Sequence, residues 1–228
     1  MQAINHAATA LILKRKFPEA PLFGLILATE AVEYLWVGLN LLGVERTILG
    51  EDLRSVADVH LVHMPLSHSV ATSALIALVA CLAIRMHRGR AAISVAVAMA
   101  LGIFSHVVLD LAVHARDIAI APFLDGRYGS GLYAELPLLA LAVETAWGLA
   151  CWWLYRGSTR LLCVMLALGV VSIPLYTVAI DVGEAMIGGH STVFALVILV
   201  QMAASSALLW AFARETRPAA LRPGRAAA

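Results

Sequence analysis

The sequence predicts an all-α integral membrane protein, a single helical transmembrane domain over residues 1–228 with six spans. Three observations predict this class. The chain is 61% hydrophobic and 14% charged, whereas soluble domains carry about 25% charged residues. Six apolar segments are long enough to cross a bilayer. The basic residues alternate between the two ends of those segments, which indicates that both termini are cytoplasmic.

The six segments follow from the thickness of a bilayer. A span needs about 20 apolar residues, because about 30 Å of hydrocarbon is crossed at 1.5 Å per residue. We expect spans at about residues 22–42, 68–84, 91–113, 136–155, 161–180 and 192–212. Each must be helical, since lipid offers backbone groups no other partner. Residues 3–16 can form a further, half-spanning helix, and residues 213–228 read as a basic tail.

The orientation follows from the positions of the sixteen basic residues. Four lie on the predicted outer side, namely Arg46, Arg54, Arg116 and Arg127. Twelve lie on the predicted inner side, namely Lys14, Arg15, Lys16, Arg85, Arg88, Arg90, Arg156, Arg160, Arg214, Arg217, Arg222 and Arg225. This bias favours cytoplasmic N- and C-termini.

Composition also argues against several function classes. The net charge of +1 makes nucleic acid an unsuitable partner. The cysteines Cys81, Cys151 and Cys163 have no metal-type spacing. No serine stands in a nucleophile-elbow motif, so a serine hydrolase is not supported.

The informative residues are ionisable ones in or beside the spans. They are Glu30, Glu33, His63, His68, His106, Asp110 and Glu144. An aspartate at the centre of a transmembrane helix costs about 2.5–3.5 kcal/mol on insertion scales, and such residues usually mark a functional site. Within "SHVVLDLAVHARD", His106, Asp110 and His114 recur every four residues and therefore form one polar stripe along a helix.

Imidazoles and carboxylates converging inside a helical bundle are typical of a metal site. We expect a divalent metal, zinc above all, with manganese or iron as alternatives, because the set offers nitrogen and oxygen ligands. The predicted ligands are His68, His106 and Asp110, joined by Glu30, Glu33, His63 and His6, the last carried inward by the half-spanning helix. Glu33 or Glu144 is the predicted general base.

Structural roles are the competing interpretation of these residues. Glu30, Glu33 and Glu144 could each be a carboxyl group that is hydrogen-bonded between helices. His106 and Asp110 could form a structural hydrogen bond with no metal.

Several of these motifs resemble the inner-membrane family of membrane-bound metal-dependent hydrolases. That family shows an early histidine, a Pro-Asp-x-Asp element, His-Arg-x-x-Thr-His-Ser, and Gly-x-x-Ser-His-x-x-x-Asp. Here His6 is the early histidine, "HMPLSHS" begins at His63, and "GIFSHVVLD" supplies the last element in full. The chain departs in "ATEAVEY", where Glu30 and Glu33 replace the aspartates, and at Met64, which replaces the arginine.

The resemblance implies a multi-pass protein of a bacterial-type inner membrane that hydrolyses lipid esters or phosphoesters from the outer side. Its expected partners are membrane lipid and other membrane proteins. An alternative is a non-catalytic subunit of a larger membrane complex that retains the hydrolase-like fold. A proton or metal transporter is a third option, which the lack of internal symmetry in the sequence disfavours.

Overall fold

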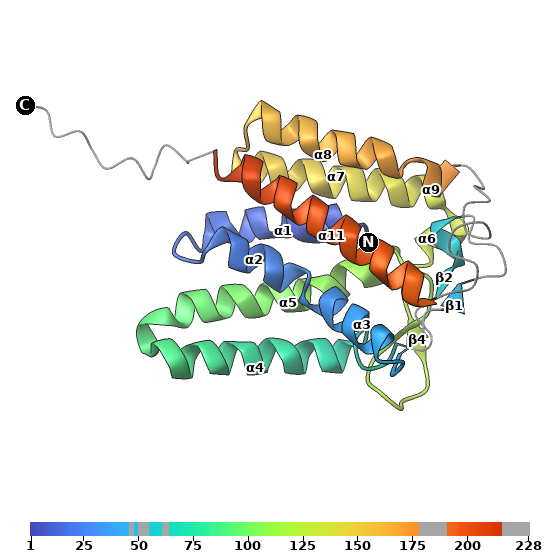
Figure 1. Cartoon of the computed structure of the whole chain (residues 1–228), viewed down its shortest axis with the longest axis horizontal. Coiled ribbons are helices and arrows are strands. Elements are labelled where there is room, and N and C mark those ends of the chain that lie inside the picture. Colours follow the sequence, from blue (N-terminus) through green and yellow to red (C-terminus); the bar gives the residue numbers. More distant parts are fainter. Residues whose placement is uncertain (46–47, 50–54, 61–63, 178–190, 216–228) are drawn as a thin grey trace, which may run out of the picture.

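The computed structural model describes residues 1–45, 48–49, 55–60, 64–177 and 191–215 as an all-α helical bundle (Figure 1). The predicted ligand His63, the end of the fifth predicted span and most of the basic tail lie outside these residues. The helices are α1 (Ala3–Lys16), α2 (Leu22–Thr29), α3 (Ala31–Leu41), α4 (Val70–Arg88), α5 (Ile93–Val113), α6 (Leu132–Glu135), α7 (Pro137–Tyr155), α8 (Thr159–Ser172), α9 (Pro174–Thr177) and α11 (Ser191–Ala213), with short 3-10 helices at Val56–Asp58 and Arg90–Ala92.

Five helical segments of the described chain are long and apolar enough to cross a membrane, which makes this a multi-pass membrane protein. They are Val70–Arg88, Arg90–Val113, Pro137–Tyr155, Thr159–Thr177 and Thr192–Ala213. The pair α2 and α3 forms a sixth if its two halves count as one span. The second predicted span starts two residues later than expected, because the Ser69 side chain caps α4 by accepting a hydrogen bond from the Thr72 N–H.

Short strands gather at one end of the bundle together with α6 and α9 (Figure 1). Strands β1 (Ile48–Leu49) and β2 (Val59–His60) pair antiparallel, with Ile48 opposite His60. Strands β3 (Ile118–Ala119) and β4 (Arg127–Tyr128) do the same, with Ile118 opposite Tyr128. The Ala71 N–H also donates to the Ile120 carbonyl, which ties the β3 segment to the start of α4.

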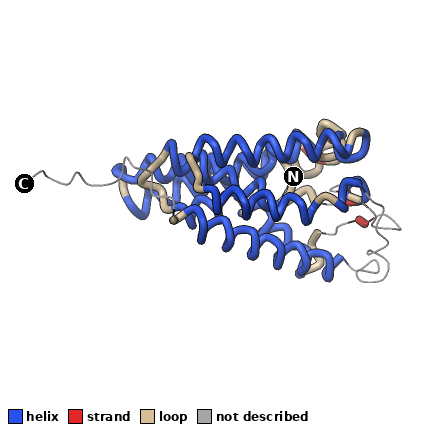
Figure 2. The backbone as a smooth tube through the Cα atoms, turned by 90° about the horizontal axis from the view of Figure 1, so that it is seen from above, coloured by secondary structure: helices blue, strands red, loops and turns tan. Residues whose placement is uncertain are grey.

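Helix α1 lies in the middle of the bundle, so that the N-terminus is found inside the molecule (Figures 1 and 2). It contacts α2, α5, α7, α8 and α11. Nine of its fourteen residues are buried. At 1.5 Å per residue it is about 21 Å long, too short to cross the bilayer. The predicted helix over residues 3–16 is therefore present, and it carries His6 into the interior of the bundle.

The first predicted span is not one continuous helix. The chain bends by 53° between α2 and α3, where Glu30 has φ −101° and ψ 2°. Backbone breaks at membrane depth are tolerated where neighbouring protein groups bind the freed polar atoms. Here the Thr29 carbonyl accepts a hydrogen bond from His106 Nδ1 at 2.9 Å. The expectation of one continuous helix over residues 22–42 was wrong. The residue that binds the freed Thr29 carbonyl, His106, lies 77 positions further along the chain, so the local sequence does not reveal the break.

Candidate metal centre

Helix α5 supplies the centre of the site. His106 and Asp110 are one turn apart, and their side chains are 1% and 2% exposed. One turn earlier, Gly102 lets α2 approach closely, since a Cβ atom there would lie 3.1 Å from the Cβ of Ala28. Because residue 102 has no side chain, the end of α2 packs directly against the face of α5 that carries His106.

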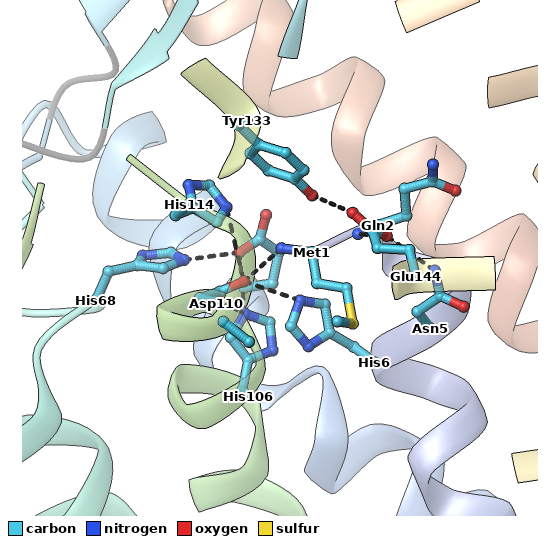
Figure 3. Close-up of polar contacts among 12 residues, drawn as sticks. Met1, Gln2, Asn5, His6, His68, His106, Asp110, His114, Tyr133 and Glu144 are labelled. Atoms are coloured by element: carbon cyan, nitrogen blue, oxygen red, sulfur yellow. Dashed lines mark hydrogen bonds and ion pairs between the residues drawn. The ribbon is translucent and has the colours of Figure 1, made fainter. Parts of the chain in front are cut away.

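Four nitrogen atoms surround the Asp110 carboxylate (Figure 3). Oδ1 lies 2.5 Å from the amino group of Met1, 3.2 Å from His6 Nε2 and 3.6 Å from His114 Nε2. Oδ2 lies 3.3 Å from His106 Nε2. The rings of His6 and His106 are stacked, with centroids 3.8 Å apart. The predicted stripe on α5 therefore converges on one carboxylate, joined by α1.

A second group of side chains shares His106. Glu33, in the first turn of α3, places Oε2 3.0 Å from His68 Nε2 and 3.5 Å from His106 Nε2. His68 itself lies in the turn before α4 and is 4% exposed. Three elements that are far apart in sequence thus present one oxygen and two nitrogen atoms to the same small volume.

The protonation of His106 is determined by its surroundings. Its Nδ1 must carry a proton, because its partner, the Thr29 carbonyl, only accepts hydrogen bonds. In the neutral ring, Nε2 then carries a lone pair that faces Glu33 Oε2 and Asp110 Oδ2, both of which are acceptors. A lone pair facing two carboxylate oxygens is stable only with a cation between them or with a proton there, carried by the ring or by one of the carboxyl groups.

These donors fit a divalent metal ion. His6, His106 and Asp110 form one group, and Glu33, His68 and His106 form another; within each, one ligand atom per residue lies within 4.8 Å of the others. The donors are imidazole nitrogen and carboxylate oxygen, which suits zinc, manganese or iron(II). The carbonyl that orients His106 is the kind of partner that metal-binding histidines have.

Glu30 lies at the break in the first span and is fully buried. Within the described residues, neither of its carboxylate oxygens has a hydrogen-bond partner. It interacts electrostatically with His106, Glu33 and Asp110. Because a buried carboxyl group without partners is costly, its position beside the two groups indicates a role in the site.

Glu144, one of the two predicted general bases, is hydrogen-bonded through both oxygens of its carboxylate. Its Oε1 accepts hydrogen bonds from Tyr133 and Tyr176 at 2.5 and 2.8 Å. Its Oε2 accepts from the Gln2 N–H and from Asn5 Nδ2, both at 2.8 Å. Burial and the nearby carboxylate raise the pKa of Tyr133 well above its usual value, so that this phenol stays a donor. With both oxygens occupied, Glu144 holds the start of α1 in place.

The structure brings together five of the predicted site residues in the two metal-type groups, namely His6, Glu33, His68, His106 and Asp110. Glu30 interacts electrostatically with three of them, and Glu144 lies outside both groups. Sequence reasoning missed Glu45, which is 1% exposed and binds the turn that carries His68. No spacing rule identifies it, since it follows α3 in an otherwise ordinary loop. His114 was predicted as part of the stripe, and its ring packs against Tyr133 with centroids 4.9 Å apart.

Comparison of the chain with protein-family models, with curated proteins and with solved structures finds no match. The geometry of the two metal-type groups is therefore the main indication of what the chain does.

Proposed function

We propose that the protein is a membrane-embedded, metal-dependent hydrolase that uses a divalent ion, zinc above all. One observation carries the proposal: His106 commits Nδ1 to the Thr29 carbonyl and directs Nε2 at two carboxylate oxygens. The resemblance of "GIFSHVVLD" and "HMPLSHS" to metal-dependent membrane hydrolases supports the same function.

The residues divide into two roles. His6, His68, His106, Asp110 and Glu33 are the proposed ligands. A divalent ion, when bound, lowers the pKa of a water molecule and polarises an ester or phosphoester oxygen. Glu30 is the carboxyl group positioned to accept a proton, because within the described chain both its oxygens are unpartnered. This assignment replaces Glu144, whose oxygens are occupied.

A lipid ester or phosphoester is the proposed substrate. A cavity of about 170 Å³ lies between α1, α7 and α8, and its lining is mainly apolar. Its polar end is formed by Gln2, Asn5 and Glu144, next to the residues that surround Asp110. An acyl chain among the helices, with its polar group toward the metal centre, matches this gradient.

The proposed orientation places both termini in the cytoplasm of a bacterial-type inner membrane, with six spans. In that orientation the strands, α6 and α9 lie at the outer end of the bundle (Figure 1). The substrate is then taken from the outer side.

A second candidate is a non-catalytic subunit of a larger membrane complex. Two observations favour it. The Met1 amino group already lies against Asp110 and supplies a positive charge there. Glu144 is fully hydrogen-bonded between helices, as a purely structural carboxylate is. In this function the polar residues hold the bundle together without a metal.

Metal analysis of the purified protein tests the proposal. We expect about one or two zinc, manganese or iron ions per chain in the wild type and in His87→Ala, which changes an exposed histidine near the end of α4. His106→Ala should lose most of the metal. Wild-type protein that stays metal-free after incubation with zinc, manganese(II) and iron(II) contradicts the proposal. A stoichiometric protein partner recovered with such metal-free protein supports the subunit.

A further inference from the structure

Glu45 holds the turn that carries His68. It follows α3 in a loop and is almost completely buried. Its Oε1 accepts hydrogen bonds from the N–H groups of Leu66 and Ser67 at 2.6 and 2.9 Å. Its Oε2 accepts from the Ser67 hydroxyl at 2.6 Å. The same hydroxyl oxygen lies 2.8 Å from His68 Nδ1.

The direction of these hydrogen bonds follows from counting protons. A carboxylate only accepts, so that the single hydroxyl proton of Ser67 points at Glu45. The Ser67 oxygen can then only accept from His68, which requires the proton of the neutral ring to be on Nδ1. In the neutral ring, His68 Nε2 is left with a lone pair 3.0 Å from Glu33 Oε2, and a cation or a second proton can occupy the position between these two atoms.

We propose that Glu45 sets the tautomer of His68 through the Ser67 hydroxyl and so keeps Nε2 of His68 available as a ligand atom. This inference rests on the proposed metal centre for its purpose. Its physical content, the position of one proton on His68, can be measured without any metal. Glu45 is a positioning residue, since it acts through Ser67 and His68 and lies in neither metal-type group.

An isosteric substitution should reverse the direction of the hydrogen bonds. In Glu45→Gln the amide oxygen takes the Oε1 position, because two N–H groups donate there. The amide NH₂ group then faces Ser67 and donates to its oxygen. Ser67 turns its own proton to His68 Nδ1, which must accept it. The ring proton of neutral His68 moves to Nε2, where it donates to Glu33 and blocks metal ligation.

Nitrogen-15 NMR of the histidine rings tests this in metal-free protein in lipid nanodiscs. Spectra are recorded near pH 8, above the ordinary histidine pKa of about 6.5. We expect a proton on His68 Nδ1 in the wild type, whether or not Nε2 also carries one, and a proton on Nε2 alone in Glu45→Gln. His106 is the internal control, because its Nδ1 proton is bound by the Thr29 carbonyl in both proteins. A His68 Nδ1 that carries no proton in the wild type, or that stays protonated in the variant, overturns the proposal.

Two variants of Ser67 show whether the hydroxyl is the link. Ser67→Ala should leave His68 as a mixture of tautomers, whereas Ser67→Thr keeps a hydroxyl and should keep the proton on Nδ1.

Zinc titration adds a second readout. Glu45→Gln should weaken zinc binding by about 10–100-fold, because losing the partner that orients a metal ligand typically costs that much affinity. A tautomer switch in a protein that binds no metal supports the role of Glu45 and refutes the proposed function, so the two outcomes are distinguishable.

Discussion

Individual atoms decide the chemistry of this site. Asp110 and Glu144 are both buried carboxylates, yet their partners differ in kind. Glu144 meets four ordinary donors, two phenols, an amide and a backbone N–H. Asp110 meets the Met1 amino group and three imidazole nitrogens, which are metal ligands when unprotonated. Glu144 therefore has the contacts of a carboxylate that stabilises the fold, whereas the contacts of Asp110 support its proposed role as a metal ligand.

Replacing Glu144 tests this division. Glu144→Gln presents an NH₂ group to two of the four donors, and each donor left unsatisfied costs about 1–3 kcal/mol. We expect a clearly lower melting temperature in detergent but unchanged metal content. Glu135→Gln is the control, since Glu135 is 62% exposed and pairs with Arg116 at 3.5 Å, an exposed pair worth at most about 1 kcal/mol. Loss of metal without loss of stability in Glu144→Gln contradicts the assignment.

At the scale of elements, close approaches and helix ends position the ligands. Gly102 allows α2 to pack against α5, the break before α3 frees the Thr29 carbonyl for His106, and Ser69 begins α4 just after His68. Glu33 follows the same break in the first turn of α3, where the helix dipole favours a negative charge. Each proposed ligand thus lies near a helix end or one turn from the close contact at Gly102.

A bulky residue at Gly102 should disturb the site from a distance. Gly102→Leu forces α5 away from Ala28, and such overpacking costs about 1–3 kcal/mol. Because His106 lies one turn further along the same face, we also expect weaker zinc binding, measured by titration. Gly38→Leu is the matched control: Gly38 is also helical, and a Cβ atom there meets nothing within 4 Å. Equal effects of the two substitutions would show that helix approach is not the cause.

The whole molecule is a bundle arranged around the short helix α1. Its burial places His6 beside Asp110 and lets Gln2 and Asn5 bind Glu144. The connections that carry the strands lie together at one end, whereas α1 and α2 are joined at the other (Figure 1). The charge bias of the sequence predicts that the strand-bearing end faces outward.

Reporter fusions test this topology. Alkaline phosphatase, which is active only outside the cytoplasm, should be active when fused after Asp125, between β3 and β4. It should be inactive after Ser158, between α7 and α8, and after Ala228. Green fluorescent protein fused at the same three positions should give the opposite pattern. Activity of the phosphatase at Ser158 would mean that the bundle is inverted.

Much of the bundle was predictable from the sequence, because burial in lipid depends on local composition. The apolar runs around α4, α5, α7, α8 and α11 follow from hydrophobicity and length alone. The helix that carries His6 was a possibility that the sequence allowed but did not require. The stripe of His106, Asp110 and His114 was equally accessible, since spacing by four places side chains on one helix face.

The pairing of polar groups, in contrast, is visible only in the folded molecule. The break at Glu30 depends on His106, which lies 76 positions later in the chain. The role of Glu144 depends on its hydrogen bonds with Tyr133 and Tyr176. The role of Glu45 depends on a turn that begins 21 residues further along the chain. Hydrophobicity is a property of each segment, so the spans and the candidates for ligation could be found from the residues alone. Hydrogen bonds are properties of pairs, and their partners are known only when the helices have packed.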